Sequence, residues 1–314
     1  MDVIPSELLP MSKIGEITSS KIEDEWLIED LWLWNAAGII GGQPKVCKSW
    51  LGLDMAISVA SETPCLGRFS VKKPGPTLVY LAEDSAAQVR GRVAGICQRR
   101  NLNIATLNLT LITSPVLRLD DDGDRERLLR SMEAIRPKLL LLDPLVRLHR
   151  LDENNSRDIA TLLGFLRQLQ RTFECAVVLT HHSSKRASAR PGQGLRGSSD
   201  LHAFGDSNLY LNRNGDILEL SAEHRAAAAM DPIALQLAGE TNAIALELAN
   251  PPTVPKPPSI EEKILRILGR SENPISRSSL RQSLRVNNQR FGQTLANMLR
   301  SGDIVATPDG FSLA

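Results

Sequence analysis

Short apolar segments alternate with amphipathic ones through most of the chain. Nearly unbroken apolar runs predict one strand that begins at residue 36 and four further strands at 77–82, 107–112, 138–142 and 176–180. A parallel sheet that is covered on both faces has such continuous hydrophobic strands. Between the runs, apolar residues at helical spacing predict helices over 49–61, 85–98, 125–135 and 156–173. The alternation predicts an α/β fold with a mostly parallel sheet.

A second group of shorter apolar runs follows, at 208–211, 217–220, 233–237 and 243–248. Asn214-Gly215 separates the first two runs, and this pair of residues favours a hairpin turn. Strands that follow one another without intervening helices pair in antiparallel fashion. We therefore expect the parallel sheet to have an antiparallel extension.

Composition divides the chain into four parts. Residues 1–24 are polar and lack a sustained period, which predicts an N-terminal arm before a large domain of residues 25–250. Residues 251–258 contain five prolines and predict an extended linker. Residues 259–314 predict three helices and then a hairpin with an Asp309-Gly310 turn. This is the order of a winged helix-turn-helix domain.

Length, charge and cysteine content narrow the class of protein. The 314 residues suit one α/β core with a small additional domain. Four cysteines without C-x-x-C spacing, and no secretory leader, predict a reduced cytoplasmic protein without disulfides or a zinc site. The longest apolar runs, such as 139–142, are too short to span a membrane.

One stretch between the first strand and its helix carries the strongest chemical signal. Gly42, Lys48 and Ser49 match the phosphate-loop template G-x-x-x-x-G-K-[ST], and Cys47 stands where the second glycine belongs. Such a loop wraps backbone N–H groups around a phosphate, while the lysine reaches the β- and γ-phosphates and the hydroxyl binds Mg²⁺. A glycine-rich turn without a ligand is the alternative.

Carboxylates follow two of the apolar strands. Glu83 and Asp84 come directly after the strand at 77–82, at the edge where open α/β sheets bind ligands. Asp143 ends the strand at 138–142, in the place of the aspartate that holds Mg²⁺ in phosphate-loop proteins. For the first pair, a solvated strand end is the alternative. The acidic run 120–124 lacks a calcium-loop pattern and is interpreted as the charged start of a helix.

The strand at 176–180 ends in His181-His182. Neighbouring residues of a strand point to opposite faces, so one of the two histidines at most faces the site, where it could sense the γ-phosphate. The following segment, 183–199, carries four cations, Lys185, Arg186, Arg190 and Arg196, and no acid. Such a segment suits a nucleic-acid backbone, and a solvated surface loop is the alternative.

Three tryptophans, Trp26, Trp32 and Trp34, precede the phosphate loop. They are interpreted as a hydrophobic lead-in that covers the sheet, with a platform for a nucleotide base as the alternative.

The C-terminal domain is the basic part of an otherwise nearly neutral chain. Residues 256–314 hold nine Lys or Arg against five Asp or Glu, whereas the whole chain has a net charge of +1. The predicted recognition helix, 287–300, offers Asn287, Asn288, Gln289, Arg290 and Gln293 from its first turns. These features favour duplex DNA as a partner, and a domain used only for protein contacts is the alternative.

Five sequence blocks in order carry a family resemblance: Gly42 to Ser49, YLAED at 80–84, LDPLVRLH at 142–149, THHSSK at 180–185 and LRGSS at 195–199. Residues 36–240 resemble the RecA-like ATPases of the RepA/KaiC group, most closely the plasmid RepA-type hexameric replicative helicases. The resemblance implies a RecA-like core, ATP and Mg²⁺ as cofactors, a homo-hexamer, and single-stranded DNA bound through the ring.

The resemblance also implies roles for individual residues. Glu83 would orient or deprotonate the attacking water, and His182 would sense the γ-phosphate. Ser49 and Asp143 would hold the metal. The nucleotide would be bound by Gly42, Gln43, Pro44, Lys45, Val46, Cys47, Lys48, Ser49 and Trp50.

This sequence departs from the RepA pattern at two places. Cys47 replaces a glycine that adopts positive φ, so its Cβ would crowd the phosphate or alter the loop. RepA-type helicases carry a trans-acting arginine shortly after the Arg-Gly-Ser-Ser block, where this chain has Asp206-Ser207. The substitute arginine finger is expected to be Arg225, in Glu223-His224-Arg225.

Two classes of function follow. The first is an ATP-hydrolysing DNA motor, a replicative helicase or translocase. The second is an ATP-switched DNA-binding regulatory or assembly factor that does not unwind DNA.

Overall fold

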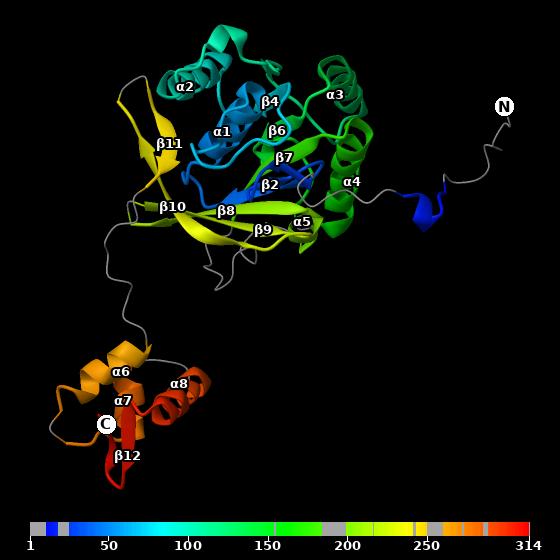
Figure 1. The fold of residues 1–314 in the computed structure, drawn as a ribbon. Helices are drawn as coiled ribbons and strands as arrows, with labels where there is room; N and C mark the ends of the chain where they lie inside the picture. Colours follow the sequence, from blue (N-terminus) through cyan, green and yellow to red (C-terminus); the bar gives the residue numbers. More distant parts are fainter. Residues whose placement is uncertain are drawn as a thin grey trace. The chain divides into compact units, whose positions relative to one another are not determined.

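The computed structural model describes residues 11–17, 25–153, 155–183, 199–215, 217–240, 243–249, 260–271, 273–284 and 288–313. The chain divides into two compact units, residues 1–250 and 251–314 (Figure 1). None of the helices in these described stretches combines the length and apolar character that a membrane span requires.

A nine-stranded sheet forms the centre of the first unit. Its order is β11-β10-β9-β8-β3-β7-β6-β4-β5, and the six strands from β8 to β5 run parallel. These six are β3 (Ala37–Gly42), β4 (Thr77–Leu81), β5 (Leu109–Leu111), β6 (Leu139–Asp143), β7 (Ala176–His182) and β8 (Ser207–Asn214). The alternating α/β architecture expected from the apolar runs is therefore confirmed.

Helices cover both faces of the parallel strands (Figure 1). Leu139 and Leu141 of β6 pack with α1 (Lys48–Ser61) and α2 (Ala86–Arg99) in one core cluster. Leu140 and Leu142 pack on the other face with three helices, α3 (Asp122–Ile135), α4 (Ser156–Phe173) and α5 (Ser199–Phe204). Because successive side chains of a strand point to opposite faces, a strand buried on both sides has to be apolar throughout.

Polar side chains cap the N-termini of several of these helices, and α2 and α3 are two examples. Ser85 accepts a hydrogen bond from the N–H of Gln88 and caps α2. Asp121 accepts one from the N–H of Asp124 at 3.0 Å, so the acidic run starts α3, three residues before the expected start of that helix. Both caps satisfy N–H groups that have no partner inside the helix.

The antiparallel extension consists of β9 (Ile217–His224), β10 (Met230–Ala238) and β11 (Ala245–Leu248). Asn214 pairs with Ile217 across the β8–β9 turn, where Gly215 has φ 63°. β10 starts three residues earlier than the apolar run predicts, and its register shifts between Met230 and Ile233. Pro232 lies within that shift, as is usual for a proline in a strand.

Two short strands, β1 (Trp26–Ile28) and β2 (Trp32–Leu33), lie before β3. Trp32 is fully buried, and its indole N–H donates to the carbonyl of Ala36 at 3.3 Å. Trp26 packs edge-on against His224, and Trp34 lies beneath the ammonium of Lys138. All three tryptophans have protein partners of this kind, which favours packing over a platform for a base.

Three 3₁₀ turns complete the described part of the first unit: η1 (Ile14–Glu16), η3 (Ile104–Thr106) and η4 (Leu145–Arg147). The second unit contains α6 (Ile260–Leu268), α7 (Arg277–Leu284), α8 (Asn288–Ser301), β12 (Ile304–Thr307) and β13 (Gly310–Leu313). The two strands are antiparallel, and Ile275 forms a bridge with Phe311. Its core centres on Ile264, Leu280 and the fully buried Phe291.

Candidate functional site

The phosphate-loop segment, the two strand-end carboxylates and one histidine meet at the carboxyl edge of the sheet. β3, β4, β6 and β7 all end there, because they are parallel. They surround a cavity of about 250 Å³, the phosphate-loop cavity. Its lining residues are Lys45, Cys47, Lys48, Ser49, Trp50, Glu83, Arg92, Asp143, Pro144 and His182.

The loop between β3 and α1 has the backbone shape of an anion cradle. Lys45 has φ 65° and Cys47 has φ 64°, both in the left-handed region. Gly42 approaches its neighbours so closely that a Cβ there would lie 2.5 Å from the carbonyl oxygen of Leu211. Turns of this kind direct successive backbone N–H groups toward one point, at the start of a helix.

Other residues of the loop have different surroundings. Gln43 and Pro44 are exposed together with Lys45, whereas Val46 is buried in the main core. Trp50, half-buried, lines the cavity one residue after Ser49.

Cys47 adopts the conformation that the family pattern assigns to glycine. It is the N-cap of α1 and has ψ 27°. Its side chain packs partly against the main core and partly lines the cavity, and burial raises the pKa of the thiol. Cys47 thus keeps the left-handed backbone despite its Cβ, at a cost of about 1–2 kcal/mol, and crowding of a bound phosphate by this side chain stays a prediction.

Lys48 is buried inside the loop that it follows. Its ammonium donates to the carbonyl oxygens of Gly42 at 3.0 Å and Gln43 at 2.8 Å. It also lies 3.2 Å from Nδ1 of His182. Burial is the main cause that lowers the pKa of Lys48 to about 8, against the attraction of Asp143 and Glu83.

Asp143 ends β6 inside the sheet. The hydroxyl of Thr180, on the neighbouring β7, donates to its carboxylate, and Ser49 forms a second side-chain hydrogen bond. Burial raises the pKa of Asp143 despite these contacts. A hydroxyl and a buried carboxylate at one point are ligands that suit Mg²⁺, which commonly takes one or two protein ligands plus phosphates and water. The donor set therefore fits this ion.

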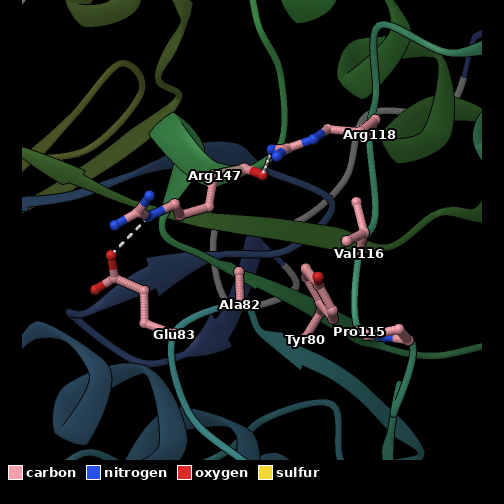
Figure 2. Close-up of a pocket in the computed structure, with 7 residues that line it drawn as sticks. All are labelled: Tyr80, Ala82, Glu83, Pro115, Val116, Arg118 and Arg147. Atoms are coloured by element: carbon pink, nitrogen blue, oxygen red, sulfur yellow. Dashed lines mark hydrogen bonds and ion pairs between the residues drawn. The ribbon is translucent and has the colours of Figure 1, made fainter.

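Glu83, two residues beyond β4, forms an ion pair across the edge of the sheet. Its carboxylate accepts from Nε of Arg147 at 2.8 Å, as Figure 2 shows. Arg147 lies in η4, four residues after Asp143. Glu83 thus lines the phosphate-loop cavity while its carboxylate is held by Arg147, which does not line that cavity.

The two histidines at the end of β7 lie on opposite faces. His182 pairs in register with Gly42 of β3 and lies beside Lys48. His181 is buried, with Nδ1 3.8 Å from the carboxylate of Glu153. The inference that one histidine at most faces the site agrees with this geometry.

Two side chains of the site region were not anticipated from the sequence. Arg92 of α2 forms a bidentate pair with Asp84, at 2.7 and 2.8 Å, and lies over the ring of Trp50. Arg213 of β8 donates to the carbonyl of Lys45 at 3.3 Å. Arg92 follows Asp84 by about two helical turns, and this spacing in the sequence could have predicted their ion pair. No sequence pattern near Arg213 predicts its contact with the loop.

Arg225 lies at the opposite end of the strands. It follows β9 and pairs with Asp206 at 3.1 Å, and Asp206 also accepts from the N–H of Ala37 at the start of β3. Within one chain it is therefore remote from Lys48, and its assignment as a trans-acting finger stays a prediction.

The expected DNA contacts are only partly covered. Lys185, Arg186, Arg190, Arg196 and Asn287 lie outside the described residues. Asn288 and Arg290 belong to the first turn of α8, and nothing is described of their side chains. The DNA-binding assignments stay predictions.

Comparison with solved structures gives low sequence identity and a shared core. A DnaB-like replicative helicase, solved in a study of its interactions with primase, is 16% identical with a TM-score of 0.51; the match covers 67% of this chain and 58% of that one. The RadB recombinase is 13% identical with a TM-score of 0.50, over 69% and 92%. A KaiC-like protein from Pyrococcus horikoshii OT3 is 18% identical with a TM-score of 0.47, over 70% and 93%.

Sequence comparison with curated proteins gives no match. The family described as AAA domain matches residues 4–188, which is more than half of the chain. This range contains the phosphate loop, both strand-end carboxylates and His182. The chain belongs to this AAA domain family, and its core has a RecA-like fold, which it shares with the RadB recombinase and the DnaB-like replicative helicase.

Proposed function

We propose that the protein is an ATP-dependent DNA-binding motor, a RepA-like replicative helicase or translocase that hydrolyses ATP with Mg²⁺ at subunit interfaces. One observation carries this proposal: Lys48, Ser49, Asp143, Glu83 and His182 line a single cavity at the carboxyl edge of the parallel sheet. These are the group types that phosphoryl transfer to water requires.

Each residue has a distinct task in this proposal. The N–H groups of residues 43–48 and the ammonium of Lys48 bind the phosphates, and Ser49 with Asp143 holds the metal. Bound Mg²⁺ supplies charge neutralisation on the phosphate oxygens. Glu83 orients the attacking water and takes its proton, and His182 contacts the γ-phosphate beside Lys48. Positioning of this kind supplies most of the rate enhancement in phosphoryl transfer.

DNA binding is assigned to two places. The basic segment between β7 and α5, with Lys185, Arg186, Arg190 and Arg196, contacts single-stranded DNA. The second unit is a winged-helix domain that binds duplex DNA through α8, with Asn287, Asn288 and Arg290 as contacts. Its order of three helices and an antiparallel pair, and its basic charge, support this assignment.

The assembly is proposed to be a hexamer, in which a residue from one subunit completes the site of the next. Arg225 is the candidate finger. An arginine finger raises the rate of hydrolysis about 10³- to 10⁵-fold. A loss of this size on removal of Arg225 would therefore indicate a site shared between two subunits.

ATP hydrolysis and strand displacement on a forked duplex test the proposal, with and without single-stranded DNA. We expect DNA-stimulated hydrolysis and ATP-driven unwinding, both abolished in Lys48→Ala. Lys72→Ala serves as the control, because Lys72 pairs with Glu29 away from the cavity. Absence of ATP binding to the wild-type protein would overturn the enzyme assignment.

The second candidate is an ATP-switched DNA-binding factor without unwinding activity. It is favoured by one observation: Glu83 and Arg225 are both engaged in ion pairs, with Arg147 and Asp206. If their ion pairs keep the Glu83 carboxylate and the Arg225 guanidinium from contacting the nucleotide, the protein would bind ATP and hydrolyse it slowly. ATP-dependent assembly on DNA with no displaced strand would support this candidate.

A further inference from the structure

A second cavity, of about 410 Å³, lies on the other side of Glu83. We name it the arginine cavity, and Figure 2 shows its lining residues: Tyr80, Ala82, Glu83, Pro115, Val116, Arg118 and Arg147. They come from the end of β4, from the segment between β5 and α3, and from η4. Glu83 is the one residue that lines both this cavity and the phosphate-loop cavity.

Positive charge exceeds negative charge in the arginine cavity. Two guanidinium groups, of Arg118 and Arg147, face one carboxylate, that of Glu83. Nε of Arg147 donates to Glu83. The guanidinium of Arg118 donates to the carbonyl of Arg147 and forms no ion pair with a carboxylate of the described residues. A monoanion would balance this excess.

The pair between Glu83 and Arg147 is accessible to a competing anion. The side chains are 50% and 60% exposed, respectively. Ion pairs at such exposure contribute little and are screened by salt. Guanidinium groups bind phosphate oxygens through two parallel N–H donors. The contact of Arg147 with Glu83 uses only Nε, so a phosphate could form the stronger, bidentate contact.

The remaining wall of the cavity is apolar. Pro115, Val116 and Ala82 stand beside the ring of Tyr80 (Figure 2), and Val116 is half-exposed. An apolar wall next to cationic groups suits a nucleotide unit, whose base or sugar lies on the wall while its phosphate contacts the cations. The volume is within the range of ligand cavities.

We propose that the arginine cavity binds a phosphodiester group of a single-stranded nucleic acid, and that binding frees Glu83 for the phosphate-loop cavity. The proposal rests on the role of Glu83 in the proposed function. Without a strand, Arg147 holds the carboxylate of Glu83. With a strand, the phosphate takes the N–H groups of Arg147, and Glu83 is available to orient water next to Lys48. Hydrolysis is thereby coupled to strand binding.

Three variants of the full chain test the proposal. Arg118→Gln and Arg147→Gln remove one guanidinium each. Arg150→Gln is the matched control, because Arg150 follows closely in sequence, is 69% exposed and pairs with Asp120 outside the cavity. Binding of a fluorescein-labelled oligothymidylate is measured against salt concentration, and ATP hydrolysis is measured with and without the oligonucleotide.

We expect both cavity variants to bind the oligonucleotide about fivefold more weakly, with a salt slope reduced by about one. Arg147→Gln should also hydrolyse ATP faster than wild type in the absence of the oligonucleotide and respond less to its addition. Binding and stimulation equal to those of Arg150→Gln in both variants would overturn the proposal. So would equal competition by inorganic phosphate, since it would indicate a site for free anions.

The experiments test the role of the arginine cavity separately from the proposed ATPase activity. If hydrolysis depends on Lys48 but not on Arg147, the ATPase assignment stands and the coupling is wrong. If no Lys48-dependent hydrolysis exists, the ATPase assignment fails, and the oligonucleotide titrations alone decide whether the arginine cavity binds a strand.

Discussion

The ammonium of Lys48 lies 3.2 Å from Nδ1 of His182, although 134 residues separate them in the sequence. Parallel pairing of β3 with β7 causes this, since Gly42 and His182 are register partners at the ends of the two strands. A γ-phosphate bound by Lys48 would therefore contact the last residue of β7 as well.

The position of His182 predicts a defect in turnover more than in binding. In His182→Asn we expect kcat for ATP to fall about tenfold or more while the Kd for ATP changes less than about threefold, because a contact made mainly in the transition state affects kcat. Single-turnover rates and calorimetric titrations measure the two quantities. His202→Asn is the control, since His202 is exposed and pairs with Glu223. Equal rates in both variants would contradict the sensor role.

ATP affinity is expected to fall as the pH rises through about 8. Burial lowers the pKa of Lys48 to about 8 from 10.5, and only the charged ammonium attracts phosphate. Above this pKa the nucleotide-free protein must take up a proton to bind ATP. Calorimetry at pH 9 in buffers of different ionisation enthalpy should show proton uptake. Affinity that stays constant up to pH 10 would show that Lys48 keeps its charge.

The same shift bears on stability, with the opposite sign. Between pH 8 and 10.5 the unfolded chain binds more protons at Lys48 than the folded chain does. The contribution of Lys48 to the free energy of unfolding therefore rises with pH in this range.

The left-handed backbone at Cys47 predicts opposite effects for two substitutions. Cys47→Gly adopts φ 64° without strain, so we expect ATP affinity equal to or tighter than wild type. Cys47→Val places a β-branched side chain at positive φ and should weaken ATP binding about tenfold or more. Cys97→Val, on the buried face of α2, is the control for a generic loss of packing. Tighter ATP binding by the valine variant than by the glycine variant would contradict this account.

Removing one partner of the buried ion pair between α1 and the end of α2 is predicted to cause a large loss of stability. Asp54 is fully buried, accepts from the N–H of Leu66 at 2.8 Å and pairs with Arg100, which also donates to Ser58. Arg100→Ala leaves this carboxylate uncompensated and should lower the free energy of unfolding by about 3 kcal/mol.

The neighbouring residue provides the control for that variant. Arg99→Ala removes an exposed pair with Glu247 and should cost less than about 1 kcal/mol. Urea unfolding followed by tryptophan fluorescence measures both, because all four tryptophans lie in the first unit. Similar losses in the two variants would mean that Asp54 gains other partners.

The sequence predicts the parallel strands well because burial on both faces forces them to be apolar, as in 139–142. It predicts Lys48, Ser49 and Asp143 as site residues because a loop motif and a strand end each define a fixed place in this architecture. The short strands β1 and β2 were not predicted as a pair, since two or three residues carry no period.

Contacts between segments that are far apart in the sequence could not be predicted from local sequence patterns. Arg147 and Glu83 are 64 residues apart, and Arg213 reaches Lys45 across 168. An arginine on a strand end or a 3₁₀ turn appears the same in sequence whether it faces solvent or a carboxylate. Only the strand order β8-β3-β7-β6-β4 brings these pairs together.

The carbonyl oxygen of Gly42 accepts two hydrogen bonds, from the ammonium of Lys48 at 3.0 Å and from the N–H of Ser183 at 3.1 Å. When a triphosphate draws the ammonium away, this oxygen keeps a single donor, and that donor is the residue at which the chain leaves β7 for its most basic stretch. In the proposed function, nucleotide binding would thus change the number of donors on an oxygen that also anchors the first residue of the segment 183–199.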